Sequence, residues 1–158
     1  MQRPSWGACR AKRHSASYRL ECSWQAEAEL TELDCAWMPR VHTSFDATAT
    51  AFERDDSLNT QYLVLAEHPD GSGRRLEIQR SLRVDEQDLS LGMDTYCLVT
   101  EEQATHYGGV LGWRIEGSTL HLDLTEEADR VLGASGFRIS VPGSERAKVQ
   151  SALMVLLA

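Results

Sequence analysis

Short segments in which apolar and polar residues alternate constrain the fold of this chain more than any other feature. From residue 45, for example, Phe45, Ala47 and Ala49 are separated by polar residues. Alternation with a period of two places successive side chains on opposite faces of a β-strand. We therefore expect strands at residues 45–51, 76–79, 93–100, 111–115, 120–124 and 137–141, and the nearly all-apolar run at 61–66 predicts an inner strand.

Turn residues separate these segments. The sequence Pro-Asp-Gly-Ser-Gly at residues 69–73 predicts a turn that joins two neighbouring strands into a hairpin. Gly117 and Ser118 fit a two-residue hairpin turn between the next pair. We expect the polar residues 85–88 and the stretch 103–109 to be loops.

Two helices are predicted late in the chain. Thr125 is placed to cap the first, which should stop at Gly133. Ser144 is placed to cap the second, whose apolar stripe consists of Val149, Ala152, Leu153, Leu156 and Leu157. Because strands outnumber helices, we predict an α+β fold with a mainly antiparallel sheet and two late helices, the last at the C-terminus.

The composition changes near Met38 and Pro39. Residues 1–37 mix Arg, Ser, Gly and Ala, and residues 18–37 fit a strand and a helix equally well. Two interpretations stay open: residues 1–37 are a disordered extension, or translation begins at Met38. Residues 38–158 are predicted to form a single domain with one hydrophobic core.

The charge of the chain indicates the kind of partner it can have. The net charge is −8, although residues 1–20 hold five basic residues and no acidic one. Such an acidic body repels nucleic acid and attracts basic proteins. No apolar run approaches the roughly 18–20 residues that span a bilayer, and no secretory signal is present, so we expect a cytoplasmic protein without a membrane partner.

The sequence contains no recognisable catalytic motif. Gly71, Ser72 and Gly73 join two strands and cannot offer the N–H groups of a helix to a phosphate. Ser135 lacks the glycine spacing of a nucleophile elbow. The five histidines form no metal-binding pair, and the four cysteines lack zinc-site spacing, so we expect free thiols, no metal and no cofactor.

A group of carboxylates is the one candidate for chemistry. Asp85, Glu86, Asp88 and Asp94 lie within ten residues of one another. Such a group is most often a solvated turn, and the second interpretation is a surface that faces a protein. A third is a small metal-binding or hydrolytic domain, in which Asp85, Asp88, Asp94 and His106 would act together.

Several short sequence motifs resemble those of one known family. They are Asp-Glu-Gln-Asp at residues 85–88, Gly-Met-Asp at 92–94 and Tyr-Gly-Gly at 107–109, with Gln103 between them. Together they resemble the immunity protein 10 family of bacterial polymorphic toxin systems. Residues 61–65 and 76–80 are similar to early strands of that family, and the resemblance runs over residues 41–158.

The resemblance implies an immunity protein, used in bacterial competition, that binds a cognate toxin tightly and catalyses nothing. A regulatory adaptor for a host enzyme is a further possibility that the sequence leaves open. For the toxin-binding surface we predict an acidic patch with embedded aromatic residues along the strand at 93–100, where Asp94 and Tyr96 share a face. The predicted contact residues are Asp85, Glu86, Asp88, Asp94, Tyr96, Gln103 and Tyr107.

Overall fold

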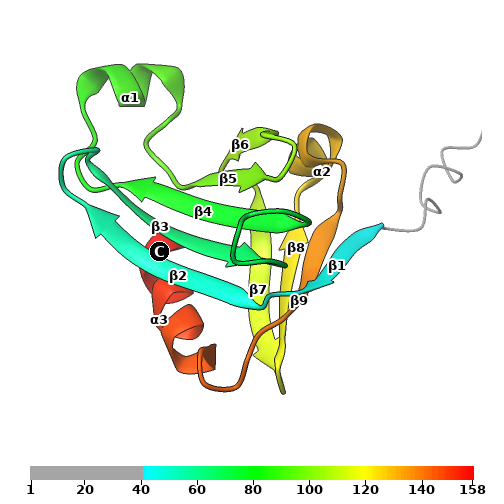
Figure 1. Cartoon of the computed structure of the whole chain (residues 1–158). Helices are drawn as coiled ribbons and strands as arrows, with labels where there is room; N and C mark the ends of the chain where they lie inside the picture. Colours follow the sequence, from blue (N-terminus) through cyan, green and yellow to red (C-terminus); the bar gives the residue numbers. More distant parts are fainter. Residues whose placement is uncertain (1–40) are drawn as a thin grey trace, which may run out of the picture. The chain divides into compact units, whose positions relative to one another are not determined.

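The computed structural model describes residues 41–158, which form nine strands and three helices (Figure 1). The predictions for residues 1–37 lie outside the described residues. The elements in chain order are β1 (His42–Asp46), β2 (Ala49–Asp55), β3 (Thr60–Ala66), β4 (Arg75–Ser81), α1 (Glu86–Leu91), β5 (Cys97–Thr100), β6 (Thr105–Tyr107), β7 (Val110–Glu116), β8 (Thr119–Leu124), α2 (Glu126–Leu132), β9 (Gly136–Ser140) and α3 (Arg146–Leu156).

The strands form two sheets. Sheet A has the order β1-β9-β8-β7, and sheet B has the order β2-β3-β4-β5-β6. Every neighbouring pair is antiparallel except β1 and β9, which run parallel. The predicted α+β class with a mainly antiparallel sheet is confirmed, and so is the hairpin of β3 and β4, in which Leu65 pairs with Leu76.

The predicted strand at residues 45–51 is divided between the two sheets. Its first part belongs to β1 in sheet A and its second part to β2 in sheet B. The backbone N–H of Ala47 still donates to the carbonyl of Ser140 on β9, at 2.8 Å, before the chain crosses over. Phe45 and Ala47 lie in the core before the crossing, whereas beyond it Phe52 packs against the core. Ala51 then points away from the core, so the apolar alternation continues through a change of face that the pattern alone does not reveal.

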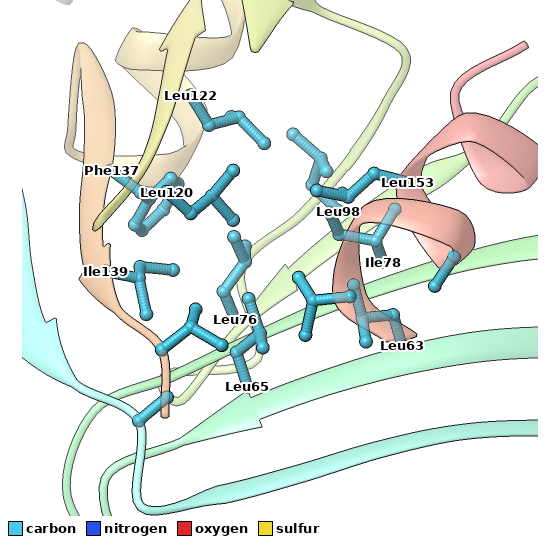
Figure 2. Close-up of a cluster of buried hydrophobic side chains, with 14 of the residues drawn as sticks. Leu63, Leu65, Leu76, Ile78, Leu98, Leu120, Leu122, Phe137, Ile139 and Leu153 are labelled. Atoms are coloured by element: carbon cyan, nitrogen blue, oxygen red, sulfur yellow. The ribbon is translucent and has the colours of Figure 1, made fainter. Parts of the chain in front are cut away.

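Leucine and isoleucine side chains from the two sheets meet in one hydrophobic core (Figure 2). Helix α3 contacts β2, β3 and β4 of sheet B, and its residues Val149, Ala152, Leu153 and Leu156 are all buried. The predicted stripe is therefore confirmed for these four residues.

The predicted start of the last helix is wrong. Helix α3 begins at Arg146 with Glu145 at its N-cap, and no side chain caps it. The N–H of Glu145 donates to the carbonyl of Pro142 at 2.9 Å, so Ser144 lies inside a turn that precedes the helix. At the other end, the Arg80 guanidinium donates to the carbonyl of Ala158 at 2.7 Å and satisfies an acceptor beyond the helix.

The predicted cap and stop of the first late helix are confirmed. The Thr125 hydroxyl accepts a hydrogen bond from the N–H of Ala128 at 3.3 Å, and Gly133 ends α2 with a φ of +69°. Alternation in the sequence would place Leu111 on one face with Trp113 and Ile115, but a β-bulge between Val110 and Gly112 shifts the pairing of β7. Val110 packs against the core in place of Leu111, which is exposed.

Candidate partner-binding surface

Residues 85–88, predicted to be a loop, are the start of helix α1. The Asp85 carboxylate accepts hydrogen bonds from the backbone N–H groups of Gln87 (2.8 Å) and Asp88 (2.9 Å). The Asp88 carboxylate in turn accepts one from the N–H of Asp85 at 3.2 Å. This reciprocal pair is a capping box made of two aspartates, and their charges favour the positive end of the helix dipole.

Helix α1 ends at Gly92, whose φ is +68°, and it stands clear of both sheets (Figure 1). None of its residues is buried. Leu89 and Leu91 are 60% and 61% exposed, so the helix is held by its caps and its two connections, without a hydrophobic face in the core. We call residues 84–94 the acidic arm.

The acidic arm carries uncompensated negative charge. Its four carboxylates are those of Asp85, Glu86, Asp88 and Asp94, and it contains no Lys or Arg. Within residues 41–158, no basic side chain forms an ion pair with any of the four. Leu89 and Leu91 add exposed apolar area to this negatively charged surface.

Tyr107 lies near the acidic arm, whereas Gln103 does not. The N–H of Gly108, the residue after Tyr107, donates to the carbonyl of Tyr96 just beyond the arm at 2.8 Å. Partial burial raises the pKa of Tyr107, and the nearby Cys97 thiol and Asp88 carboxylate raise it further. Gln103 occupies the turn at the far end of β5, where its φ is +62°.

The predicted strand at residues 93–100 is too long, because β5 begins only at Cys97. Asp94 and Tyr96 therefore do not share a strand face. Tyr96 packs against the core, and its hydroxyl accepts a hydrogen bond from the N–H of Val110 at 2.9 Å. This contact supports a structural role for Tyr96, since it orients the chain as it enters β7.

The Tyr-Gly-Gly motif at residues 107–109 forms a turn that requires glycine. Gly108 and Gly109 have φ values of +70° and +87°. A Cβ atom on Gly109 would lie 2.7 Å from the Cβ of Ala128 and 2.8 Å from the imidazole of His106. A side chain at this position would therefore clash with both β6 and α2, as well as straining the backbone.

The residues of the metal or hydrolytic alternative do not form one site. His106 pairs with Leu98 across β5 and β6, and its ring lies against Gly109. Asp85 and Asp88 are hydrogen-bonded to the start of α1. In the part of the chain that the structure describes, no three His, Cys, Asp or Glu side chains are grouped so that they could hold a metal ion.

Sequence reasoning missed a charged cluster on the solvent side of sheet A. The guanidinium of Arg138 on β9 donates to the Asp123 carboxylate on β8 at 2.6 Å and lies 2.5 Å from the His42 imidazole on β1. The hydrogen bond from Arg138 is the main reason that the pKa of Asp123 is lowered. Alternation along the sequence indicated that Asp123 and Arg138 point outward, but only the register of β8 and β9 brings the two side chains together. Their charges compensate each other, in contrast to those of the acidic arm.

The fold and its exposed features define a small two-sheet α+β domain that presents an acidic arm to solvent. The chain belongs to the immunity protein 10 family, which it matches over residues 46–148. This match covers sheet B, the arm, the Tyr-Gly-Gly turn and sheet A apart from most of β1. The chain matches no curated protein and no solved structure. Within residues 41–158, no helix is both long and apolar enough to span a bilayer.

Proposed function

We propose that this immunity protein binds a cognate bacterial toxin in the cytoplasm and neutralises it as a stoichiometric inhibitor. The toxin would belong to a polymorphic system that bacteria use in competition. The observation that carries the proposal is the acidic arm, because it lies within the family match and leaves four carboxylates without basic partners.

The arm combines the two features that fast and tight association needs. Unpaired negative charge accelerates the encounter with a basic protein, to about 10⁸ M⁻¹s⁻¹ or more at low salt. Once the surfaces meet, the exposed side chains of Leu89 and Leu91 provide apolar area that slows dissociation. The same negative charge disfavours a nucleic-acid partner.

A binding experiment tests this function directly. The probe is the C-terminal toxin domain encoded by the neighbouring gene, and the method is titration calorimetry with stopped-flow kinetics at several salt concentrations. We expect a 1:1 complex whose association slows as salt increases. Failure of the wild-type protein to bind or protect against this domain would overturn the proposed function.

Charge-reversal variants then test the arm. Glu86→Lys is the best choice, because Glu86 is exposed and, unlike Asp85 and Asp88, does not take part in the capping box. Glu127→Lys on α2 is the matched control, since it makes the same change in net charge at another exposed acid. We expect Glu86→Lys to slow association several-fold more than Glu127→Lys does. Equal effects would place the interface away from the arm.

A further inference from the structure

Sheet B has a second face that belongs neither to the hydrophobic core nor to the acidic arm. Leu63, Leu65, Leu76 and Ile78 point into the core, so the residues that alternate with them point to the opposite side, which we call the outer face. The strand register aligns the outer residues in two rows. One row is Glu53, Tyr62, Gln79, Cys97 and Tyr107, and the other is Ala51, Val64, Glu77, Val99 and Thr105.

No element of residues 41–158 covers the outer face. Helix α3 packs on the core side of the sheet, and in Figure 1 both α3 and sheet A lie behind sheet B. Tyr62, Val64 and Glu77 are only partly buried, and Tyr107 is 37% exposed. The outer face is thus open to solvent over β2, β3 and β4 and at Tyr107, whereas Cys97 and Val99 on β5 are buried, with 5% and 8% of their surface exposed.

The outer face combines two tyrosines with polar residues at its centre. One-sided antiparallel sheets usually place polar residues toward water. Here Gln79 and Glu77 on β4 occupy the middle of the two rows, and the partly buried Val64 lies beside Glu77. Tyr62 and Tyr107 stand on either side of this centre in the row of Gln79. Three strand spacings of about 4.8 Å place the two tyrosine positions roughly 14 Å apart. Tyrosine is the residue type that interfaces favour, because its ring is apolar and its hydroxyl remains polar.

The charge around these tyrosines is negative. The Tyr62 hydroxyl donates to the Glu53 carboxylate at 2.8 Å. The pKa of Tyr62 is raised first by this hydrogen bond, then by partial burial, and then by the negative charges of Glu53, Asp55 and Glu77. Within the described residues, neither Glu53 nor Glu77 forms an ion pair with a basic side chain. A second copy of the chain would bring like charges together here, whereas a basic protein would be attracted.

The outer face alone is smaller than a standard protein–protein interface. Five strands at about 4.8 Å spacing and about five residues at about 3.3 Å each give roughly 400 Å². A standard interface uses about 800 Å² per partner. The acidic arm comes close to the outer face at the end of β6, because the N–H of Gly108, next to Tyr107, donates to the carbonyl of Tyr96, two residues beyond the arm, at 2.8 Å. The arm therefore extends the surface that the outer face offers to a partner.

We propose that the outer face of sheet B and the acidic arm form one docking surface for a basic protein surface, with Tyr62 and Tyr107 as its anchors. That the partner is the toxin rests on the function proposed above. The arm provides attraction at long range, and the tyrosines provide the packed contacts that hold the complex.

Substitution of the anchors tests this surface against the same toxin domain. We expect Tyr62→Ala and Tyr107→Ala each to raise the Kd about tenfold or more, mainly through faster dissociation. Leu111→Ala is the matched control, because it removes an exposed apolar side chain from sheet A, and we expect less than a twofold change. Tyr62→Phe keeps the ring and should lose much less affinity than Tyr62→Ala.

Folding and electrostatics are checked separately. Urea denaturation shows whether each tyrosine variant is folded, and Glu77→Lys provides a second variant that should slow association without removing a packed ring. If the wild-type protein binds the toxin domain, and Tyr62→Ala, Tyr107→Ala and Glu77→Lys bind it with the same affinity, this inference is overturned and the proposed function stands.

The oligomeric state of the free protein is measured by light scattering, and we expect a monomer. A dimer that Tyr62→Ala dissociates would assign the outer face to a second copy and overturn the inference. Failure of the wild-type protein to bind would instead overturn the proposed function.

Discussion

Leu153→Ala is the most informative test of how the core is built. Leu153 is fully buried on the inner side of α3, and Figure 2 shows it among the core side chains of sheet B. Its neighbour Met154 is 63% exposed on the same helix. Met154→Ala is therefore the control, because both methionine and alanine favour helix and the side chain that is removed lies outside the core.

The expected magnitude follows from the atoms that are removed. Leu→Ala deletes three carbon atoms, and each is worth about 0.8 kcal/mol of transfer from water. The cavity left behind adds to this loss of roughly 2.4 kcal/mol, because the sheet and helix that surround Leu153 can close only in part. We therefore expect the free energy of unfolding to fall by about 2–5 kcal/mol in Leu153→Ala and by less than about 0.5 kcal/mol in Met154→Ala.

Urea denaturation measures the difference. With a slope near 2 kcal/mol per molar urea, Leu153→Ala should move the midpoint down by roughly 1–2.5 M, whereas Met154→Ala should barely move it. Midpoints that agree for the two variants would show that α3 is peripheral to the core, or that it serves as a partner-binding element.

Three further predictions concern other parts of the chain. The pKa of Asp123 is lower in the folded than in the unfolded state, so its ionised carboxylate stabilises the folded state. This stabilisation is complete above about pH 4 and is lost as the pH falls through the lower folded pKa. The urea midpoints of Asp123→Asn and wild type should therefore differ at pH 7 and converge in acid. Burial raises the pKa of Cys97 to about 11, so in a chain whose other cysteines are serine this thiol should react with a disulfide reagent at pH 8 much more slowly in the folded than in the unfolded state; equal rates would mean that it is accessible. A chain that begins at Met38 should fold with an unchanged melting temperature, and a loss of several degrees would show that residues 1–37 pack on the domain.

The double role of Asp85 and Asp88 affects how the arm is studied. Both are candidates for partner contact, and both hold the start of α1 through the capping box. Replacing an N-cap residue costs about 0.5–2 kcal/mol, and α1 has no buried side chain to offset such a loss. A lost interaction in an Asp85 or Asp88 variant therefore reports the shape of the arm as well as its charge. Glu86 makes no capping hydrogen bond, and Glu127→Lys, in the first turn of α2, controls for the effect of charge reversal on the helix dipole.

Local patterns in the sequence determined most of the strands and both late helices. Alternation identified the inward residues of β4 and β8, since the period of two depends only on backbone geometry, and a nearly all-apolar run predicted β3 as an inner strand. Thr125 and Gly133 marked the ends of α2, because a cap is a contact between residues three or four positions apart. The same kind of signal at Asp85 and Asp88 was present but was interpreted as a solvated loop.

Only the tertiary structure decided the features that depend on residues far apart in the chain. The crossing of the chain at Ala47, the parallel pairing of β1 with β9 and the meeting of Asp123 with Arg138 all follow from which strands become neighbours. The two rows of the outer face likewise exist only once the register of five strands is set. The physical reason is that an alternating pattern specifies two faces of a strand, whereas burial against a second layer decides which face becomes core and which is left to meet a partner.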